Sequence, residues 1–256
     1  MKVYCCQTDI AWEHKAENFK RVRALLEQDR PETGSLIVLP EMFSTGFSMN
    51  VAGIAEQVVP GAEQFLKDIA ADFEAFVIGG IASRGLDRRG LNEALVISPE
   101  GQELARYVKI HPFALGGELD NYSRGKTIES FDWHGIKVVP FICYDLRFPE
   151  IFRTAVRDGA EMFVVIANWP NKREQHWVTL LQARAIENLA YVVGVNRAGT
   201  DPQLVYPGRS MVVDPHGATL VDAGAPEKIV SAEINPATVR SWRRDFPALK
   251  DIHWRD

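Results

Sequence analysis

The sequence lacks the features that would direct it to a nucleic acid or a membrane. Its 256 residues carry a formal net charge of -5 and contain no long basic run, so a nucleic-acid partner is not expected. The N-terminal segment MKVYCCQTDIAW has no apolar stretch long enough for a signal peptide, and no later apolar run approaches a membrane span. These absences predict a cytoplasmic protein with no membrane partner.

Cysteine is also scarce, with only three residues in the chain. Cys5, Cys6 and Cys143 do not make a disulfide framework, and no CxxC or HxxxH pattern supplies further metal ligands. Cys5 and Cys6 are adjacent in a predicted strand, so their side chains should point to opposite faces of a sheet. We interpret both as small buried hydrophobic residues. A metal-binding or redox role fails on ligand count, and no cofactor is expected.

The chain does have the composition of a globular protein, with 46% hydrophobic and 25% charged residues. Apolar runs typical of strands alternate with segments of helical spacing, and no linker or low-complexity segment separates them. This organisation predicts one domain over residues 1–256. We expect helices at 17–28, 61–73, 149–158, 174–189 and 236–243, and strands at 3–7, 35–41, 76–82, 161–170, 191–199 and 228–234.

Hairpins interrupt the alternation of strands and helices. They are predicted at 94–108, 131–143 and 209–220. Because hairpins add antiparallel pairs to a sheet, the sequence predicts an α/β fold with mixed sheets. Residues 111–127 form a long, polar, glycine-rich loop between two hairpins, and loops of this length in a compact domain tend to be functional.

Three apolar runs end on a reactive side chain. IVLPE closes on Glu41, ARYVK on Lys109 and VPFIC on Cys143. Taken singly, these could be a solvated carboxylate, a solvated ammonium and a core thiol. Ligands of α/β sheets usually bind at strand ends along one edge, however, so together they predict a thiol with a carboxylate and an ammonium nearby.

A thiol, a carboxylate and an ammonium in one site can cooperate in catalysis. A free cysteine has a pKa of about 8.5, and a neighbouring ammonium or a helix N-terminus favours its thiolate. A helix is predicted to begin near Pro149, shortly after Cys143. A glutamate can accept the thiol proton and later activate water, while a lysine and a backbone N–H stabilise an oxyanion. The pattern therefore predicts acyl transfer through cysteine without a catalytic histidine.

The motifs LPEMF, YVKIHPF and CYDLRFPE resemble those of the nitrilase, or carbon-nitrogen hydrolase, superfamily. The resemblance covers nearly the whole chain and implies an α-β-β-α sandwich with two mixed β-sheets. It implies that Cys143 is the nucleophile, Glu41 the general base and Lys109 the support of the tetrahedral intermediate. The N–H of Tyr144 would be the second oxyanion donor. Glu118 matches a further glutamate of many members, the alternative being a solvent-exposed loop carboxylate.

Other segments resemble the omega-amidase branch, among them PEMFSTGFSMN, ANWP and FPALKDIHW. This resemblance implies a hydrolase that cleaves small carboxylate-bearing amides, such as 2-oxoglutaramate or 2-oxosuccinamate, to acid and ammonia through a cysteine thioester. The alternatives are a true nitrilase, an N-carbamoyl amidohydrolase or an aliphatic amidase. A non-catalytic, partner-binding member is disfavoured, because a buried charged cluster is costly to keep without use.

Several residues are candidates for binding the substrate. Arg147 could meet its carboxylate in a bidentate pair, although we prefer an ion pair with Asp145, Glu150 or Glu187. Asn168 is a second polar candidate. The candidates for a pocket wall are Phe47, Met49, Phe113, Tyr144 and Trp169, of which the aromatic residues could equally be plain core.

The C-terminal tail, about residues 245–256, is unusually apolar for a chain end. The resemblance implies a homodimer in which this tail reaches across to the partner. The alternative is that the tail folds back on its own domain. The apolar residues at issue are Trp242, Phe246, Leu249, Ile252 and Trp254.

Overall fold

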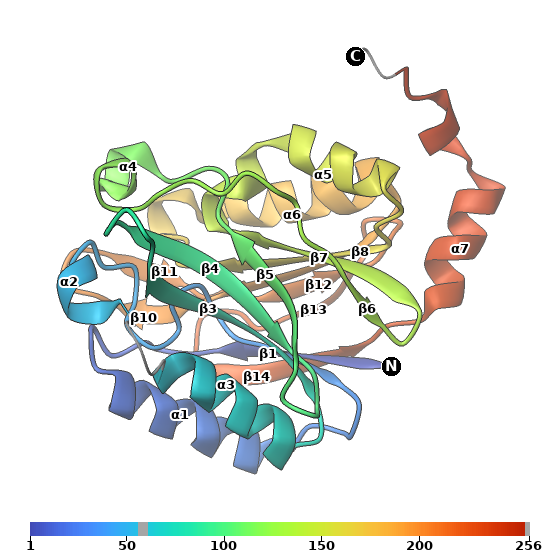
Figure 1. The fold of residues 1–256 in the computed structure, drawn as a ribbon. Coiled ribbons are helices and arrows are strands. Elements are labelled where there is room, and N and C mark those ends of the chain that lie inside the picture. The colour runs from blue at the N-terminus through green and yellow to red at the C-terminus, as the bar shows by residue number, and fades with distance from the viewer. Residues whose placement is uncertain (56–60, 254–256) are drawn as a thin grey trace.

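The computed structural model describes residues 1–55 and 61–253. Two six-stranded sheets face each other, and a layer of helices covers the outer face of each (Figure 1). Each sheet contains both parallel and antiparallel pairs. The predicted α/β fold, a nitrilase-like α-β-β-α sandwich with two mixed sheets, is therefore confirmed.

The two sheets repeat one pattern of pairing. From one edge of each sheet to the other, neighbouring strands form two antiparallel pairs, then two parallel pairs and then a final antiparallel pair. In this pattern β2 of the first sheet corresponds to β8 of the second. The first sheet contains, in order, β14 (Lys228–Glu233), β1 (Lys2–Gln7), β2 (Leu36–Val38), β3 (Phe76–Arg84), β4 (Gly90–Ile97) and β5 (Glu103–Val108). The second contains β13 (Thr219–Asp222), β12 (Met211–Val213), β9 (Tyr191–Asn196), β8 (Met162–Ala167), β7 (Ile136–Ile142) and β6 (Phe131–Trp133).

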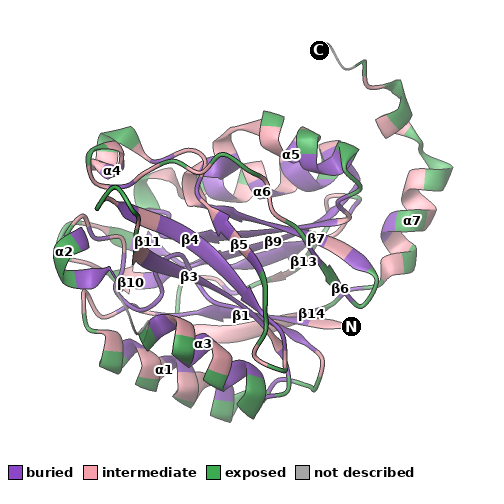
Figure 2. Ribbon diagram, in the orientation of Figure 1, coloured by how far each residue is buried: buried purple, intermediate pink, exposed green. Residues whose placement is uncertain are grey.

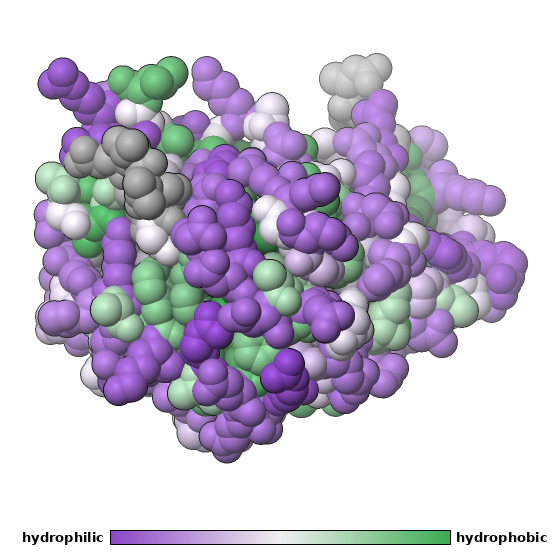
Figure 3. Space-filling view, turned by 60° about the horizontal axis from the view of Figure 1, so that its bottom comes forward, coloured by the Kyte–Doolittle hydropathy of each residue, from purple (hydrophilic) through white to green (hydrophobic). Residues whose placement is uncertain are grey.

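The covering helices form because their apolar residues recur at helical spacing. In α3 the buried residues include Phe65, Leu66 and Ile69, one stripe that faces the first sheet. The opposite faces of these helices meet solvent, and over α1 and α3 Figure 3 shows a mostly hydrophilic surface with small hydrophobic patches. The helices are α1 (Lys15–Gln28) and α3 (Gly61–Asp72) on the first sheet, and α5 (Pro149–Arg157) and α6 (Glu174–Asn188) on the second.

The strands carry most of the buried hydrophobic side chains (Figure 2). Cys5 packs in the core between the sheets, whereas Cys6 packs in the core beneath α1 and α3. The prediction that these thiols point to opposite faces as buried hydrophobic residues is confirmed. Within the described residues no group of side chains could hold a metal ion, and no helix there is long and apolar enough to cross a membrane.

Three predicted strands are shorter than expected, among them the strand predicted at 161–170, which the structure limits to Met162–Ala167. The strand predicted at 35–41 ends at Val38, because the chain turns before Glu41 and Met42 adopts a left-handed φ of 45°. The strand predicted at 191–199 breaks after Asn196, and its end forms a separate two-stranded sheet. That sheet pairs β10 (Ala198–Thr200) with β11 (Val205–Pro207).

Short elements also went unpredicted. They include α2 (Val51–Ile54) and, inside the long glycine-rich loop, α4 (Glu118–Asn121). Local turn chemistry sets such elements, and their apolar periodicity is too brief to detect. The short 3₁₀ helices are Ala114–Gly116, Cys143–Arg147, Asn171–Arg173 and Ala248–Asp251.

The last helix, α7 (Pro236–Asp245), lies at one end of the sandwich, and the chain then runs outward from it (Figure 1). Arg243 anchors the helix by donating to the backbone carbonyls of Ala160 and Leu189. Beyond the helix, Phe246 is 49% exposed, whereas Leu249 is half-buried and packs against the core, so only part of the tail folds back on its own domain. Trp254 lies outside the described residues.

Candidate active site

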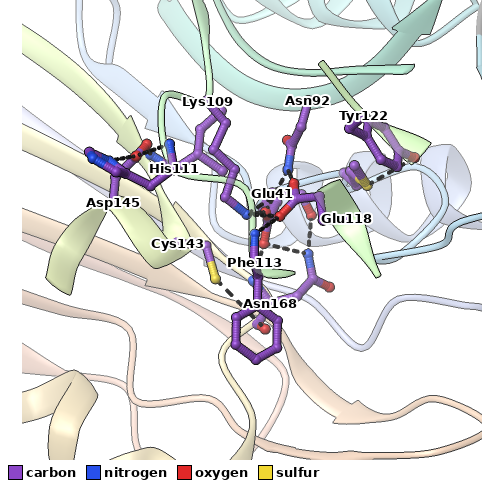
Figure 4. Close-up of polar contacts among 12 residues, drawn as sticks. Glu41, Asn92, Lys109, His111, Phe113, Glu118, Tyr122, Cys143, Asp145 and Asn168 are labelled. Carbon is purple, nitrogen blue, oxygen red and sulfur yellow. Dashed lines mark hydrogen bonds and ion pairs between the residues drawn. The ribbon is translucent and has the colours of Figure 1, made fainter. Parts of the chain in front are cut away.

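The strand ends of both sheets converge on one point. Glu41 follows β2, Lys109 follows β5 and Cys143 follows β7, while Asn168 follows β8 (Figure 4). The sandwich therefore brings together side chains that lie far apart in the sequence. Glu41 and Asn168 occupy corresponding strand ends in the two sheets, and they contact each other directly.

Lys109 is the centre of a buried charge cluster. Its Nζ lies 2.9 Å from Glu41 Oε1 and 2.9 Å from Glu118 Oε2. All three side chains are at most 1% exposed. Glu118 starts the short helix α4, so the loop in which it was predicted folds inward and its carboxylate is not solvent-exposed. Buried charges of this kind persist only when they are paired, and one ammonium here serves two carboxylates.

Asn92 holds the two carboxylates together, and the sequence analysis missed it. Its Nδ2 donates to Glu41 Oε1 at 2.7 Å and to Glu118 Oε1 at 2.8 Å. The sequence of β4 did not single it out, because a second buried polar residue, Glu93, directly follows Asn92 in that strand.

Asn168 orients Glu41 from the second sheet. Its backbone N–H donates to Glu41 Oε2 at 2.8 Å, and its Nδ2 donates to the Glu41 carbonyl at 2.6 Å. Both carboxylate oxygens of Glu41 are thus hydrogen-bonded, one to Lys109 and Asn92 and the other to Asn168. These contacts fix the rotamer of the carboxylate.

The cluster determines the charge of each member. Burial opposes the charged form of Glu41, but the Lys109 ammonium and the hydrogen bonds outweigh it and hold the pKa of Glu41 below its ordinary value of 4.5. Burial likewise opposes the charge on Lys109, but Glu118 and Glu41 raise the pKa of Lys109 well above its ordinary value. Glu41 is therefore a carboxylate and Lys109 an ammonium at neutral pH.

Cys143 begins a 3₁₀ turn directly after β7. Its φ of 47° is in the left-handed region, which is uncommon for a residue other than glycine and clusters at functional sites. Burial and the charge of Glu41 raise the pKa of the Cys143 thiol well above its ordinary value, although Lys109 acts in the opposite direction. The expected preference for thiolate is therefore outweighed, and the sulfur rests as a neutral thiol beside a charged carboxylate.

A cavity of about 360 Å³ opens over Cys143 and Lys109. Its size suits a molecule of a few carbon atoms. Every predicted substrate-binding residue lines it, namely Phe47, Phe113, Arg147, Asn168 and Trp169, together with Met49 and Tyr144. The sequence analysis did not predict the lining residues Trp12, Gly116, Pro170, Arg173, Asp201, Gln203, Leu204 and Tyr206.

Arg147 does not form the ion pair that we preferred from the sequence. Asp145 is occupied elsewhere, and Glu187 pairs with Arg184 and Arg153. The guanidinium of Arg147 instead lies 4.7 Å from the ring centroid of Trp169.

Arg173 is the second guanidinium at the cavity, and it lies 5.4 Å from the ring centroid of Phe113. Across the described ranges, neither Arg147 nor Arg173 forms an ion pair with a carboxylate. Burial, and next the charge of Arg173, lower the pKa of Arg147 below its ordinary value. Two partly desolvated cations without a counter-charge make this side of the cavity suited to an anion.

Another part of the cavity wall comes from the hairpin of β10 and β11. Asp201 lines the cavity there, but its carboxylate accepts from the backbone N–H of Leu204 and from the hydroxyl of Tyr206. Arg197, fully buried, ties this hairpin to the loop after β1 by donating to the Ile10 and Thr200 carbonyls. The wall is thus rigidly held, and its carboxylate already has partners.

Solved structures identify the class of this fold. A CN-hydrolase superfamily protein from Xanthomonas campestris superposes with a TM-score of 0.92, at 33% identity, covering 100% of this chain and 98% of the other. Nit3 of Saccharomyces cerevisiae, described as a member of branch 10 of the nitrilase superfamily, has a TM-score of 0.85 at 28% identity, with 96% and 94% covered. The sandwich is that of the nitrilase superfamily.

Residues 2–244 match the family model for carbon-nitrogen hydrolase, and the chain belongs to that family. It is 36% identical to the omega-amidase YafV of Yersinia enterocolitica, with 98% of this chain and 96% of the relative covered. It is 33% identical to the 2-oxoglutaramate amidase of Bacillus subtilis, again with 98% and 96% covered. The chain is an enzyme, an omega-amidase-like carbon-nitrogen hydrolase, as the sequence motifs indicated.

Proposed function

We propose that this hydrolase cleaves the terminal amide of a small 2-oxo dicarboxylate monoamide, of the 2-oxoglutaramate or 2-oxosuccinamate type, to acid and ammonia. One observation carries the choice of substrate: Arg147 and Arg173 border the cavity over Cys143 without a carboxylate partner in the described residues. The names of the relatives support the same class of substrate. Other amidases of the superfamily and N-carbamoyl amidohydrolases are the alternatives.

Acylation follows from the buried cluster. Glu41 is charged and takes the thiol proton, and the sulfur of Cys143 attacks the amide carbon. The carbonyl oxygen becomes an oxyanion that Lys109 and the N–H of Tyr144 stabilise. Tyr144 is the second residue of the 3₁₀ turn, and the tendency of N–H groups in a first helical turn to lack an intrahelical partner supports this role. Collapse of this tetrahedral intermediate breaks the carbon–nitrogen bond. The nitrogen takes the proton from Glu41 and leaves as ammonia.

Deacylation uses the same groups. Glu41 removes a proton from water, and the resulting hydroxide attacks the thioester carbon. The second tetrahedral intermediate meets the same oxyanion donors and expels the sulfur, which regains its proton. Asn92 and Glu118 keep Lys109 and Glu41 in place through both steps.

The nucleophile can be tested directly. Cys143→Ala should abolish ammonia release while the far-ultraviolet circular dichroism spectrum stays unchanged, because no other attacker is available. Cys5→Ala and Cys6→Ala are matched controls that should retain turnover, with stability lower by about 1 kcal/mol. Substantial activity in Cys143→Ala would exclude the mechanism.

The substrate can be tested by competition. The enzyme should prefer 2-oxoglutaramate over glutamine, butyramide and a matched nitrile when compared by kcat/KM. Butyramide lacks the carboxylate, so it leaves the two guanidinium groups unmatched. If butyramide or the nitrile is the best substrate, the assignment to 2-oxo acid amides is wrong, although the cysteine hydrolase would stand.

The carboxylate-binding pair has its own test. Arg147→Met and Arg173→Met should each lower kcat/KM for 2-oxoglutaramate about 10- to 100-fold, as expected for a charged hydrogen bond. The same variants should change kcat/KM for butyramide little. Arg30→Met is a matched control, because Arg30 lies over the ring of Phe73, away from the cavity.

We further propose that residues 1–256 form a single carbon-nitrogen hydrolase domain that acts in the cytoplasm as a homodimer, with the tail of about residues 245–256 at the interface. The exposed ring of Phe246 and its stacking on Trp242 support a contact with something beyond this chain.

A further inference from the structure

We propose that Asp145 is a positioning residue that locks the turn carrying Cys143 against the strand end carrying Lys109. Asp145 lies two residues after Cys143, and its carboxylate is fully buried (Figure 4). The inference rests on the proposed roles of Cys143 and Lys109. The hydrogen bonds of Asp145 explain what fixes the distance between Cys143 and Lys109.

Both oxygens of the Asp145 carboxylate accept hydrogen bonds. Oδ2 accepts from the hydroxyl of Tyr107 at 2.7 Å and from the backbone N–H of Ile142 at 3.1 Å. Oδ1 accepts from the backbone N–H of His111 at 2.9 Å and lies 2.9 Å from His111 Nδ1. Hydrogen bonds to an ionised acceptor are about twice as strong as neutral ones.

These partners come from both sheets. Tyr107 lies on β5 and His111 follows it, so they flank Lys109 on both sides in the sequence. Ile142 ends β7, directly before Cys143. One carboxylate therefore connects the residues on either side of the lysine to the residue that precedes the cysteine. Two aromatic contacts reinforce the connection: the ring of Tyr107 meets Phe141 edge-on at 5.6 Å, and the ring of His111 stacks on Phe148 at 3.8 Å.

The chemistry depends on this connection. The oxyanion must lie between Lys109 Nζ, which the first sheet carries, and the Tyr144 N–H, which the second sheet carries. A misplacement of about 1 Å costs on the order of 100-fold in rate. The left-handed φ of Cys143 must also be held by its surroundings. Asp145 holds the two oxyanion donors at a fixed separation and holds the backbone of Cys143 in its left-handed conformation, without facing the cavity.

The test compares two variants with a matched control. Asp145→Asn removes the charge at nearly constant volume, and Tyr107→Phe removes one of its donors but keeps the ring. Tyr191→Phe is the control, because its hydroxyl is also buried and hydrogen-bonded, to Asn235, away from the site. Unfolded protein is first removed by gel filtration, and turnover is then divided by the amount of Cys143 that iodoacetamide titrates in the folded fraction.

We expect kcat per titrated site to fall about 100-fold in Asp145→Asn and about 10-fold in Tyr107→Phe, with KM changed less than about threefold. In the double variant the loss should not exceed that of Asp145→Asn alone, because both changes remove one connection. Tyr191→Phe should keep native kcat.

The inference is overturned if kcat per titrated site stays within about threefold of native in the variants that fold, or if only KM rises. Should Asp145→Asn not fold, Tyr107→Phe decides alone. Failure of the proposed function is a separate result: Cys143→Ala would remain active, or 2-oxoglutaramate would not be turned over by the unaltered enzyme.

Discussion

Protonation of Glu41 determines how the stability and the activity of the enzyme change at low pH. Its pKa in the folded protein is below 4.5, so folding favours the charged carboxylate. Its contribution to stability is therefore present above the unfolded pKa and is lost as the pH falls through the folded pKa. The same titration removes the base from the free enzyme.

We expect the acid limb of kcat/KM to have its midpoint below pH 4.5, since this parameter reports the free enzyme. Rates should be collected across pH 3 to 8, with tryptophan fluorescence recorded as a control that the enzyme remains folded at each pH. An acid limb centred near neutral pH in folded enzyme would contradict the charge assigned to Glu41.

Lys109 serves the fold as well as the reaction. Lys109→Met would leave Glu41 and Glu118 buried without a cation, and breaking a buried pair costs about 3–5 kcal/mol. We expect this loss in urea unfolding at pH 7. It should shrink towards pH 5, because the unpaired carboxylates then take up protons.

A second change separates stability from catalysis at Lys109. Adding Glu118→Gln to Lys109→Met removes one of the stranded charges, so stability at pH 7 should partly return while turnover does not. A double variant that regained turnover would show that Lys109 acts only through the fold.

Catalytic residues could be predicted from the sequence where they lie at the ends of strands. Glu41, Lys109 and Cys143 could be selected because each closes an apolar run. Asn92 could not, since its contact with Glu41 spans 51 positions and depends on how β4 lies beside the turn after β2. Arg173 was missed because its place at the cavity depends on a short 3₁₀ helix with no periodic signal.

At the scale of elements, β3 supports the turn that carries Glu41. A Cβ on Gly80 would lie 2.5 Å from the Cα of Glu41 and 2.5 Å from the backbone nitrogen of Met42, so only glycine fits. A Cβ on the neighbouring Gly79 would meet the end of the Leu66 side chain on the other face of the strand. One strand thus packs against the site on one face and against α3 on the other.

Gly80→Ala should therefore lower kcat at least tenfold, because the backbone of Glu41 must move and positional errors are costly. Gly79→Ala is the matched control and should lower the melting temperature with native kcat, since a leucine side chain can shift. Equal kcat in the two variants, normalised to titrated Cys143, would contradict this role of Gly80.

The predicted long elements agree with the structure because their periodicity extends over many residues. The repeat of pairing between the two sheets was not foreseeable, since the strands that correspond share no evident sequence pattern. The repeat explains why Glu41 after β2 and Asn168 after β8 meet, because each follows the equivalent strand of its sheet.

At the scale of the whole molecule, the tail beyond α7 offers apolar surface. We expect sedimentation velocity at micromolar concentration to show a dimer, and a chain ending after Asp245 to sediment as a monomer. Arg243 and its carbonyl contacts remain in the shortened chain, so α7 should stay anchored. A monomer for the unshortened chain, or a dimer for the shortened one, would contradict the proposed interface.

The pairing of β1 with β14 has a consequence for synthesis on the ribosome. Strand β1 lies between β2 and β14, and β14 begins only at Lys228. A nascent chain that has not reached residue 228 leaves one edge of β1 unpaired, and open edges attract other strands. At about 5–20 residues per second this interval lasts on the order of ten seconds or more. The sheet that carries Glu41 and Lys109 is thus completed by a segment translated long after β1, which makes the nascent chain a candidate for chaperone protection.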